Sequence, residues 1–148
     1  MAKRAEPVRK SVKDVLEDLR AGHREAAFSG PESALKYLRR TFEGQASLPN
    51  AVKAIAYDLT AEAQAQCGLW EDCAASVASA LGYLPDLEAA FPHEYRRLLE
   101  ELTCFERGIQ AHSELGDFRT ALELCEQASA LGLGAHYAAK RDSLAWAR

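Results

Sequence analysis

The chain has 148 residues, of which 28 are Ala and 19 are Leu, while Val, Ile and Thr together number only 11. Ala and Leu favour helices and β-branched residues favour strands, so this composition argues against a β-sandwich, a barrel or a parallel sheet. The formal net charge is −4 and 48% of the residues are hydrophobic, which is typical of a folded chain and excludes a disordered one. We therefore expect an all-α protein.

Membrane, metal and cofactor sites are not indicated by the sequence. No apolar run approaches the roughly 18 residues of a membrane span, and the charged start of the chain lacks the apolar stretch of a secretory signal. The cysteines form no C-x-x-C pair and the four histidines are scattered, so metal-ligand spacing is missing. These features predict a cytoplasmic protein with no metal, no cofactor and no membrane partner. The cysteines, predicted to be reduced and buried, are Cys67, Cys73, Cys104 and Cys125.

Turn signals and apolar spacing divide the chain into seven predicted helices. Ser11 and Asp14 form a variant capping box before the first helix, and Pro31 is well placed to begin the second. A segment with two prolines precedes a long fifth helix, whose apolar stripe continues without a gap. The predicted helices cover, in chain order, about 11–28, 31–43, 49–66, 70–81, 92–115, 118–131 and 135–147.

The sequence repeats part of itself. The segment from Gly68 to Cys73 recurs from Gly116 to Ala121, each reading glycine, any residue, an aromatic, two polar residues and a small one. The run ASALG at 78–82 also returns at 128–132. Glycine allows one helix to end and the next to begin within a few residues. The repeat predicts two similar helical hairpins, with the Ala residues of their second helices providing close axis packing.

This pattern resembles the tetratricopeptide repeat, a unit of roughly 34 residues in two helices, over residues 54–85 and 102–133. Tyr57 and Phe105 stand where that family has a large aromatic residue. The sequence departs from the family where Ala61 and Ile109 replace its glycine, and where Gln64 and His112 replace its tyrosine. The resemblance implies a right-handed stack of about three hairpins plus a capping helix; an irregular all-α bundle is the alternative. The implied domain, 11–148, has hairpins at 11–43, 49–82 and 92–131 and a capping helix at 135–147.

The resemblance also implies a binding surface. In that family the first helix of each hairpin lines a concave face that holds an extended peptide or a partner's helix. A spacing of four independently places the polar residues of each such helix along one face. This predicted row is acidic and amide-bearing and suits a basic peptide, although a merely solvated helix face is the alternative. Its members are Asp58, Glu62, Gln66, Glu106, Gln110 and Glu114.

Two other classes of function are not favoured. A basic arm at residues 1–10 carries cations without interleaved aromatics, and residues 51–148 have a net charge of −7, so we do not expect a nucleic-acid partner. The chain has no phosphate-binding glycine loop and no nucleophile elbow, so we do not expect an enzyme. Glu100 and Glu101 each follow an arginine by four residues, which predicts ordinary surface ion pairs.

We therefore expect a protein-protein interaction module with an adaptor or regulatory role, binding a protein or peptide in a helical groove. The alternative is a self-associating all-α bundle, a homodimer without a groove. Trp146, near the end of the last predicted helix, is either a core residue or an anchor for a second subunit.

Overall fold

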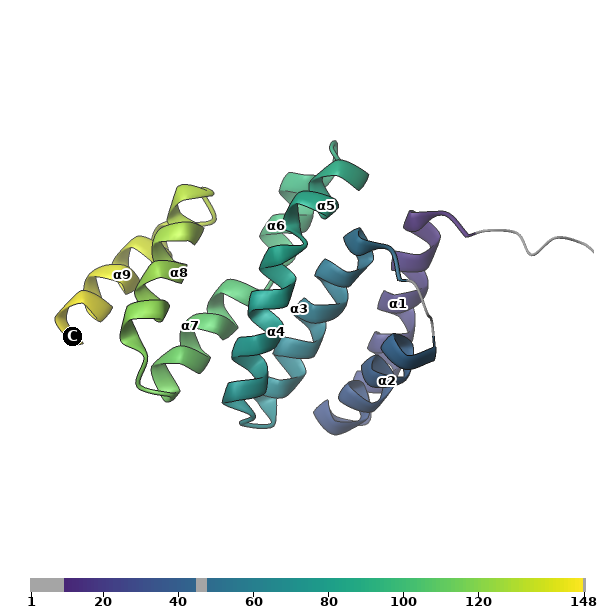
Figure 1. The fold of residues 1–148 in the computed structure, drawn as a ribbon, viewed down its shortest axis with the longest axis horizontal. Helices are drawn as coiled ribbons and strands as arrows, with labels where there is room; N and C mark the ends of the chain where they lie inside the picture. Colours follow the sequence, from purple (N-terminus) through teal and green to yellow (C-terminus); the bar gives the residue numbers. More distant parts are fainter. Residues whose placement is uncertain (1–9, 45–47, 148) are drawn as a thin grey trace, which may run out of the picture.

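A computed structural model describes residues 10–44 and 48–147, and within these ranges it contains nine helices and no strand (Figure 1). The all-α prediction is therefore confirmed for this part of the chain, although seven helices were expected. The helices are α1 Val12–Ala27, α2 Pro31–Gly44, α3 Asn50–Gln66, α4 Trp70–Gly82, α5 Leu84–Ala90, α6 Tyr95–Glu101, α7 Cys104–Glu114, α8 Phe118–Ala130 and α9 Ala135–Ala147.

Three pairs of consecutive helices pack against each other as hairpins, α1 with α2, α3 with α4 and α7 with α8, and α9 packs on α8 (Figure 1). The repeated sequence gives the same turn twice. Gly68 and Gly116 have φ of 71° and 78°, a conformation that glycine adopts without steric cost. After each glycine a backbone N–H bonds back across the turn, from Leu69 to Gln64 at 2.9 Å and from Asp117 to His112 at 2.7 Å.

The long helix predicted at 92–115 is interrupted, and that prediction is wrong. The chain leaves the helical conformation at Leu102, with φ −68° and ψ 141°, and α7 begins afresh after Thr103. The carboxylate of Asp58 on α3 accepts a hydrogen bond from the Thr103 backbone N–H at 2.9 Å. The apolar stripe continues across the break because α6 and α7 both bury part of it, so sequence periodicity could not reveal the interruption.

The segment α5–α6 links distant parts of the chain. Leu98 and Leu99 of α6 belong to the same hydrophobic cluster as Leu16 and Leu19 of α1. At the other side of α6, the Arg96 guanidinium donates to the carbonyl oxygens of Leu131 and Gly132 at 2.5 and 2.6 Å, just after α8. The insertion between the repeated hairpins thus connects α1 with the α8–α9 turn.

Helix α3 is the centre of the molecule, since it contacts α1, α2, α4, α5 and α7. The close-packing role predicted for Ala on the second helices is met by Ala80, Ala121 and Ala128, which are buried, but not by the exposed Ala75, Ala78 and Ala130. Helix α3 buries more alanines than either second helix. The buried alanines of α3 are Ala51, Ala54, Ala56, Ala61, Ala63 and Ala65.

None of the helices in the described residues is long and apolar enough to traverse a bilayer.

Candidate functional site

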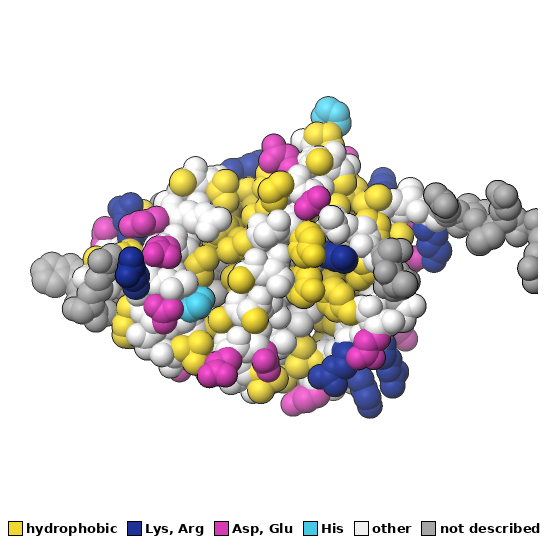
Figure 2. Space-filling view, viewed as in Figure 1, with side chains coloured by type: hydrophobic (Ala, Val, Ile, Leu, Met, Phe, Trp, Pro, Cys, Tyr) yellow, Lys and Arg dark blue, Asp and Glu magenta, His cyan; other side chains and the backbone are white. Residues whose placement is uncertain are grey.

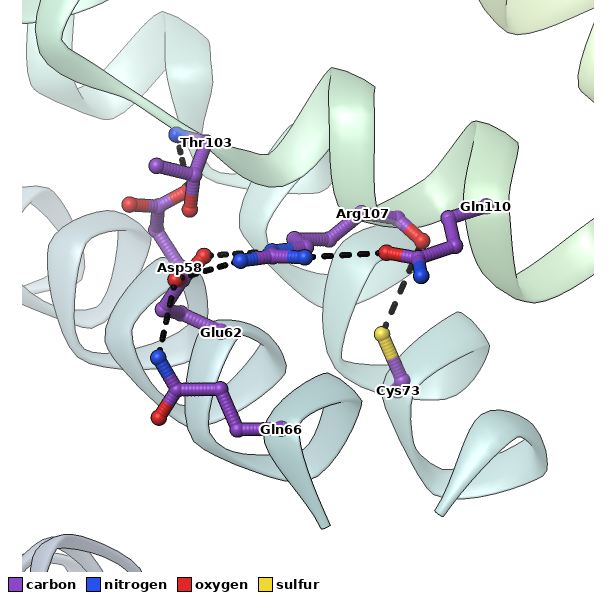
Figure 3. A network of polar contacts seen from close by, with 7 residues as sticks. All are labelled: Asp58, Glu62, Gln66, Cys73, Thr103, Arg107 and Gln110. Atoms are coloured by element: carbon purple, nitrogen blue, oxygen red, sulfur yellow. Dashed lines mark hydrogen bonds and ion pairs between the residues drawn. The ribbon is translucent and has the colours of Figure 1, made fainter. Parts of the chain in front are cut away.

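The candidate site is a polar network that joins α3 to α7 around Arg107 (Figure 3). The Arg107 guanidinium donates to both carboxylate oxygens of Glu62, from Nε at 2.6 Å and from Nη2 at 2.7 Å. Its third contact is from Nη1 to the amide oxygen of Gln110 at 2.9 Å. Gln66 donates to Glu62 at 3.3 Å. We call these four residues the Arg107 network.

The charges in this network largely cancel. The Glu62 and Arg107 side chains are only 25% and 30% exposed, and their two-point contact has the geometry of a strong arginine–carboxylate pair. The hydrogen bond from Arg107 lowers the pKa of Glu62, and the same bond raises the pKa of Arg107. The negative charge of Glu62 is therefore neutralised by Arg107 and is not offered to a partner. The predicted acidic row, in contrast, treated Glu62 as a free carboxylate.

Asp58 has a different environment from the other members of the predicted row. Its side chain is 5% exposed and accepts hydrogen bonds from the backbone at the start of α7. Burial raises the pKa of Asp58 to about 7, although the backbone N–H groups of Thr103 and Cys104 act to lower that pKa. The expectation that Asp58 stands on an open rim is corrected: its carboxylate is used as a cap for a helix distant in sequence.

The remaining members of the predicted row lie toward solvent. Gln66, Glu106 and Glu114 are exposed, and Gln110 is half-buried. Glu106 Oε1 lies 3.4 Å from His136 Nε2 of α9. The structure thus brings Glu62, Gln66 and Gln110 together, whereas Glu106 and Glu114 are exposed on α7 outside this network.

Arg107, the residue that joins the network, is not among the site residues that the sequence predicted. Arg107 stands three positions before Gln110, so helical spacing already placed it beside the row, and a cation among carboxylates was the available signal. Cys73 Sγ also contacts the Arg107 carbonyl oxygen at 3.7 Å, which ties α4 to the same region. Burial raises the pKa of the Cys73 thiol to about 11, so this thiol is protonated near neutral pH.

Helix α1, which carries none of the predicted site residues, packs against α3 beside this region. The charge of Glu62 acts on His23, whose pKa is lowered by burial. Arg20 makes an ion pair with Glu101 of α6 at 3.4 Å. One face of α1 lines a hollow of about 650 Å³, formed by Arg20, His23, Arg24, Ala27 and Phe28.

Two other features that the sequence analysis considered are surface ion pairs and metal-ligand clusters. Glu100 pairs with Arg96 at 3.0 Å and Glu101 with Arg97 at 3.9 Å, which confirms both predicted surface ion pairs. In the part of the chain that the structure describes, no cluster of His, Cys, Asp or Glu is arranged to hold a metal ion.

Two predictions concern parts outside the described structure. Of the basic arm, residues 1–9 lie outside the described residues, and Lys10 pairs with Asp18 at 2.6 Å. The Trp146 side chain also lies outside the described part, so both of its predicted roles stay predictions.

Comparison with known proteins gives no relative: no family model, no curated protein and no solved structure matches this chain.

Proposed function

We propose that this protein is an interaction module of the helical-hairpin type, resembling tetratricopeptide repeats in a right-handed stack. It binds a peptide or a partner protein along the face to which α1, α3 and α7 contribute, as an adaptor or regulatory component of the cytoplasm. The observation that carries the proposal is that Glu62 on α3 pairs with Arg107 on α7, and that α1 packs against α3. Three helices far apart in sequence therefore pack together in this part of the fold.

The Arg107 network suits a preformed binding surface. The two-point pair between Glu62 and Arg107 holds both side chains in one geometry, so little side-chain freedom remains to be lost when a partner binds. Gln66 and Gln110 extend from this rigid pair, and an amide can both donate and accept hydrogen bonds. Such groups suit the peptide backbone of a ligand.

Charge along this face differs from one end to the other. Arg20, His23 and Arg24 lie on α1, whereas Glu106 and Glu114 are exposed on α7. Charges at the rim of an interface steer association and select orientation more than they raise affinity. A bound segment would therefore be held in one direction, with its basic residues toward α7, in keeping with the basic peptide expected from the sequence.

The test uses random 12-residue peptides displayed on phage, selected on the immobilised full chain, with affinities of enriched peptides measured by fluorescence anisotropy. The double variant Glu106→Lys, Glu114→Lys is expected to weaken binding about tenfold, a loss of about 1.4 kcal/mol. The matched control is Glu123→Lys, Glu126→Lys, which makes the same charge change at exposed positions of α8.

Equal weakening by the two double variants would overturn the role of α7, and the absence of any saturable peptide binding would overturn the proposed function. Sedimentation equilibrium on the same samples distinguishes peptide binding from the alternative, self-association. A homodimer that binds no peptide would establish that alternative.

A further inference from the structure

Helix α1 and the residue that follows it carry a stripe of five residues, of which two are half-buried and the last three are exposed. Their spacing of three, four, seven and eight from the first places them on one helical face, along about 12 Å of helix. Leu16 and Leu19, which stand four positions before Arg20 and His23, are buried, so the stripe begins where the buried part of this face of α1 ends. The α1 stripe consists of Arg20, His23, Arg24, Ala27 and Phe28, and these residues line an open surface hollow.

Phe28 gives the stripe an unusual apolar end. Its side chain is 93% exposed, whereas Leu69 and Leu115, the other large exposed hydrophobic residues of the described chain, are 43% and 44% exposed. An aromatic ring left in water gains substantially when a partner covers it, because about 25 cal/mol is released per Å² of apolar area buried. Ala27, also exposed, directly precedes it, so a small apolar platform follows the basic residues.

The basic part of the stripe keeps an excess of positive charge. Arg20 is paired with Glu101 at 3.4 Å, but no carboxylate of the described residues lies within ion-pair distance of Arg24. Glu62 of α3, whose charge acts on His23, is held by Arg107. Figure 2 likewise shows Lys and Arg side chains gathered over the end of the molecule formed by α1 and α2.

We propose that the α1 stripe docks an acidic peptide segment that carries one large apolar side chain. Carboxylates of the segment pair with Arg24 and Arg20, and its apolar side chain packs on Ala27 and Phe28. A stripe of about 12 Å matches roughly four residues of an extended chain. This inference rests on the proposed function, because it names the chemistry of the segment held at the α1 end of the same face.

The experiment uses the same phage-displayed 12-residue peptides on the full chain, and then synthetic copies of enriched peptides. Enriched peptides are expected to combine Asp or Glu with an aromatic or large aliphatic residue. Arg24→Glu and Phe28→Ser are each expected to weaken their binding about tenfold. Both positions are exposed, so the variants should fold, and circular dichroism checks this.

Two controls match these changes in charge and in hydrophobicity. Arg39→Glu reverses an exposed charge on α2, and Leu69→Ser removes an exposed apolar side chain at the α3–α4 turn. Each should change the affinity less than about twofold. Replacing the acidic residues of the synthetic peptide by their amides should weaken binding and reduce its dependence on salt.

The outcomes separate the two proposals. If peptides bind saturably but Arg24→Glu and Phe28→Ser have no greater effect than their controls, the docking of an acidic segment on α1 is overturned while the proposed function stands. Enrichment of purely basic peptides would likewise overturn the docking of an acidic segment on α1 while the proposed function stands. If no peptide binds saturably, both proposals are overturned.

Discussion

Asp58 and Glu62 lie one helical turn apart on α3, yet their carboxylates meet opposite environments. Asp58 is almost fully buried at the start of α7, and burial raises its pKa to about 7. Glu62 faces the Arg107 guanidinium, which lowers its pKa. A spacing of four puts two side chains on one face of a helix, but it does not say what covers each of them. At this scale the chemistry is decided by neighbours from another helix.

The first prediction concerns the pH dependence of stability through Asp58. Its pKa rises from 3.8 to about 7 on folding, so the folded state holds the proton more tightly. The contribution of Asp58 to the free energy of unfolding is therefore greatest below about pH 4 and is lost as pH rises to about 7. Asp58→Asn removes this titration, so the stability difference should shift in favour of the variant as pH rises.

Urea unfolding followed by circular dichroism between pH 4.5 and 7.5 measures this difference. Asp72→Asn, at an exposed position of α4, controls for the simple loss of a carboxylate. A stability difference between Asp58→Asn and the parent that stays constant with pH would contradict the assigned pKa.

The second prediction concerns the pair of Glu62 and Arg107. Both side chains are mostly buried, so Glu62→Gln or Arg107→Gln leaves a charged partner without its bonds and should lower the free energy of unfolding by roughly 1–2 kcal/mol. A double-mutant cycle should give a clearly favourable coupling. The exposed pair Arg119 and Glu123, 3.7 Å apart, is the matched control and should give a coupling near zero. Similar couplings in the two cycles would refute a structural role for the network.

At the scale of elements, the position of α7 depends on a residue without a side chain. A Cβ atom at Gly108 would lie 2.7 Å from Val77 Cγ1 of α4 and 2.8 Å from Leu124 Cδ1 of α8. Gly108 thus allows α7 to approach both neighbours closely, as small residues do at helix crossings. The role predicted for alanines of the second helices is here filled by a glycine of a first helix.

The third prediction is that Gly108→Ala destabilises the protein by roughly 1–2 kcal/mol, because overpacking outweighs the better helix propensity of Ala. Chemical denaturation measures this loss. Gly82→Ala is the control, since it also lies in a helix but a Cβ there meets nothing within 4 Å, and it should be neutral or stabilising. Adding Val77→Ala to Gly108→Ala should recover part of the loss. If Gly108→Ala left the free energy of unfolding unchanged, this would show that α7 can shift to make room for the added methyl group.

At the scale of the whole molecule, two hydrophobic clusters are joined rather than independent. One contains side chains of α3, α4, α7, α8 and α9, and the other contains side chains of α1, α2, α3, α5 and α6. Arg96 reinforces this junction by donating to the last carbonyls after α8, where a cation also complements the helix dipole. The residues that pack against both clusters are Leu81, Leu102, Leu131 and Leu133.

The fourth prediction is that Arg96→Met loosens the α8–α9 end without unfolding α1–α4. Amide hydrogen exchange should accelerate several-fold in α8 and α9, because two bonds to the α8–α9 turn are lost. Arg97→Met is the control, since Arg97 makes only a 3.9 Å pair with Glu101 of its own helix. Equal exchange in both variants would mean that the leucines alone hold the junction.

The sequence by itself determined the helical character, the start of α1 and the repeated hairpin turns. These depend on local interactions: Ser11 accepts the Asp14 backbone N–H at 3.1 Å, and glycine adopts positive φ at positions 68 and 116. The break before α7, the capping role of Asp58 and the pairing of Glu62 with Arg107 were decided only by the tertiary structure. Each joins residues 45 positions apart. Local periodicity places a carboxylate on a helix face, but its charge and availability depend on which distant backbone or guanidinium packs against it.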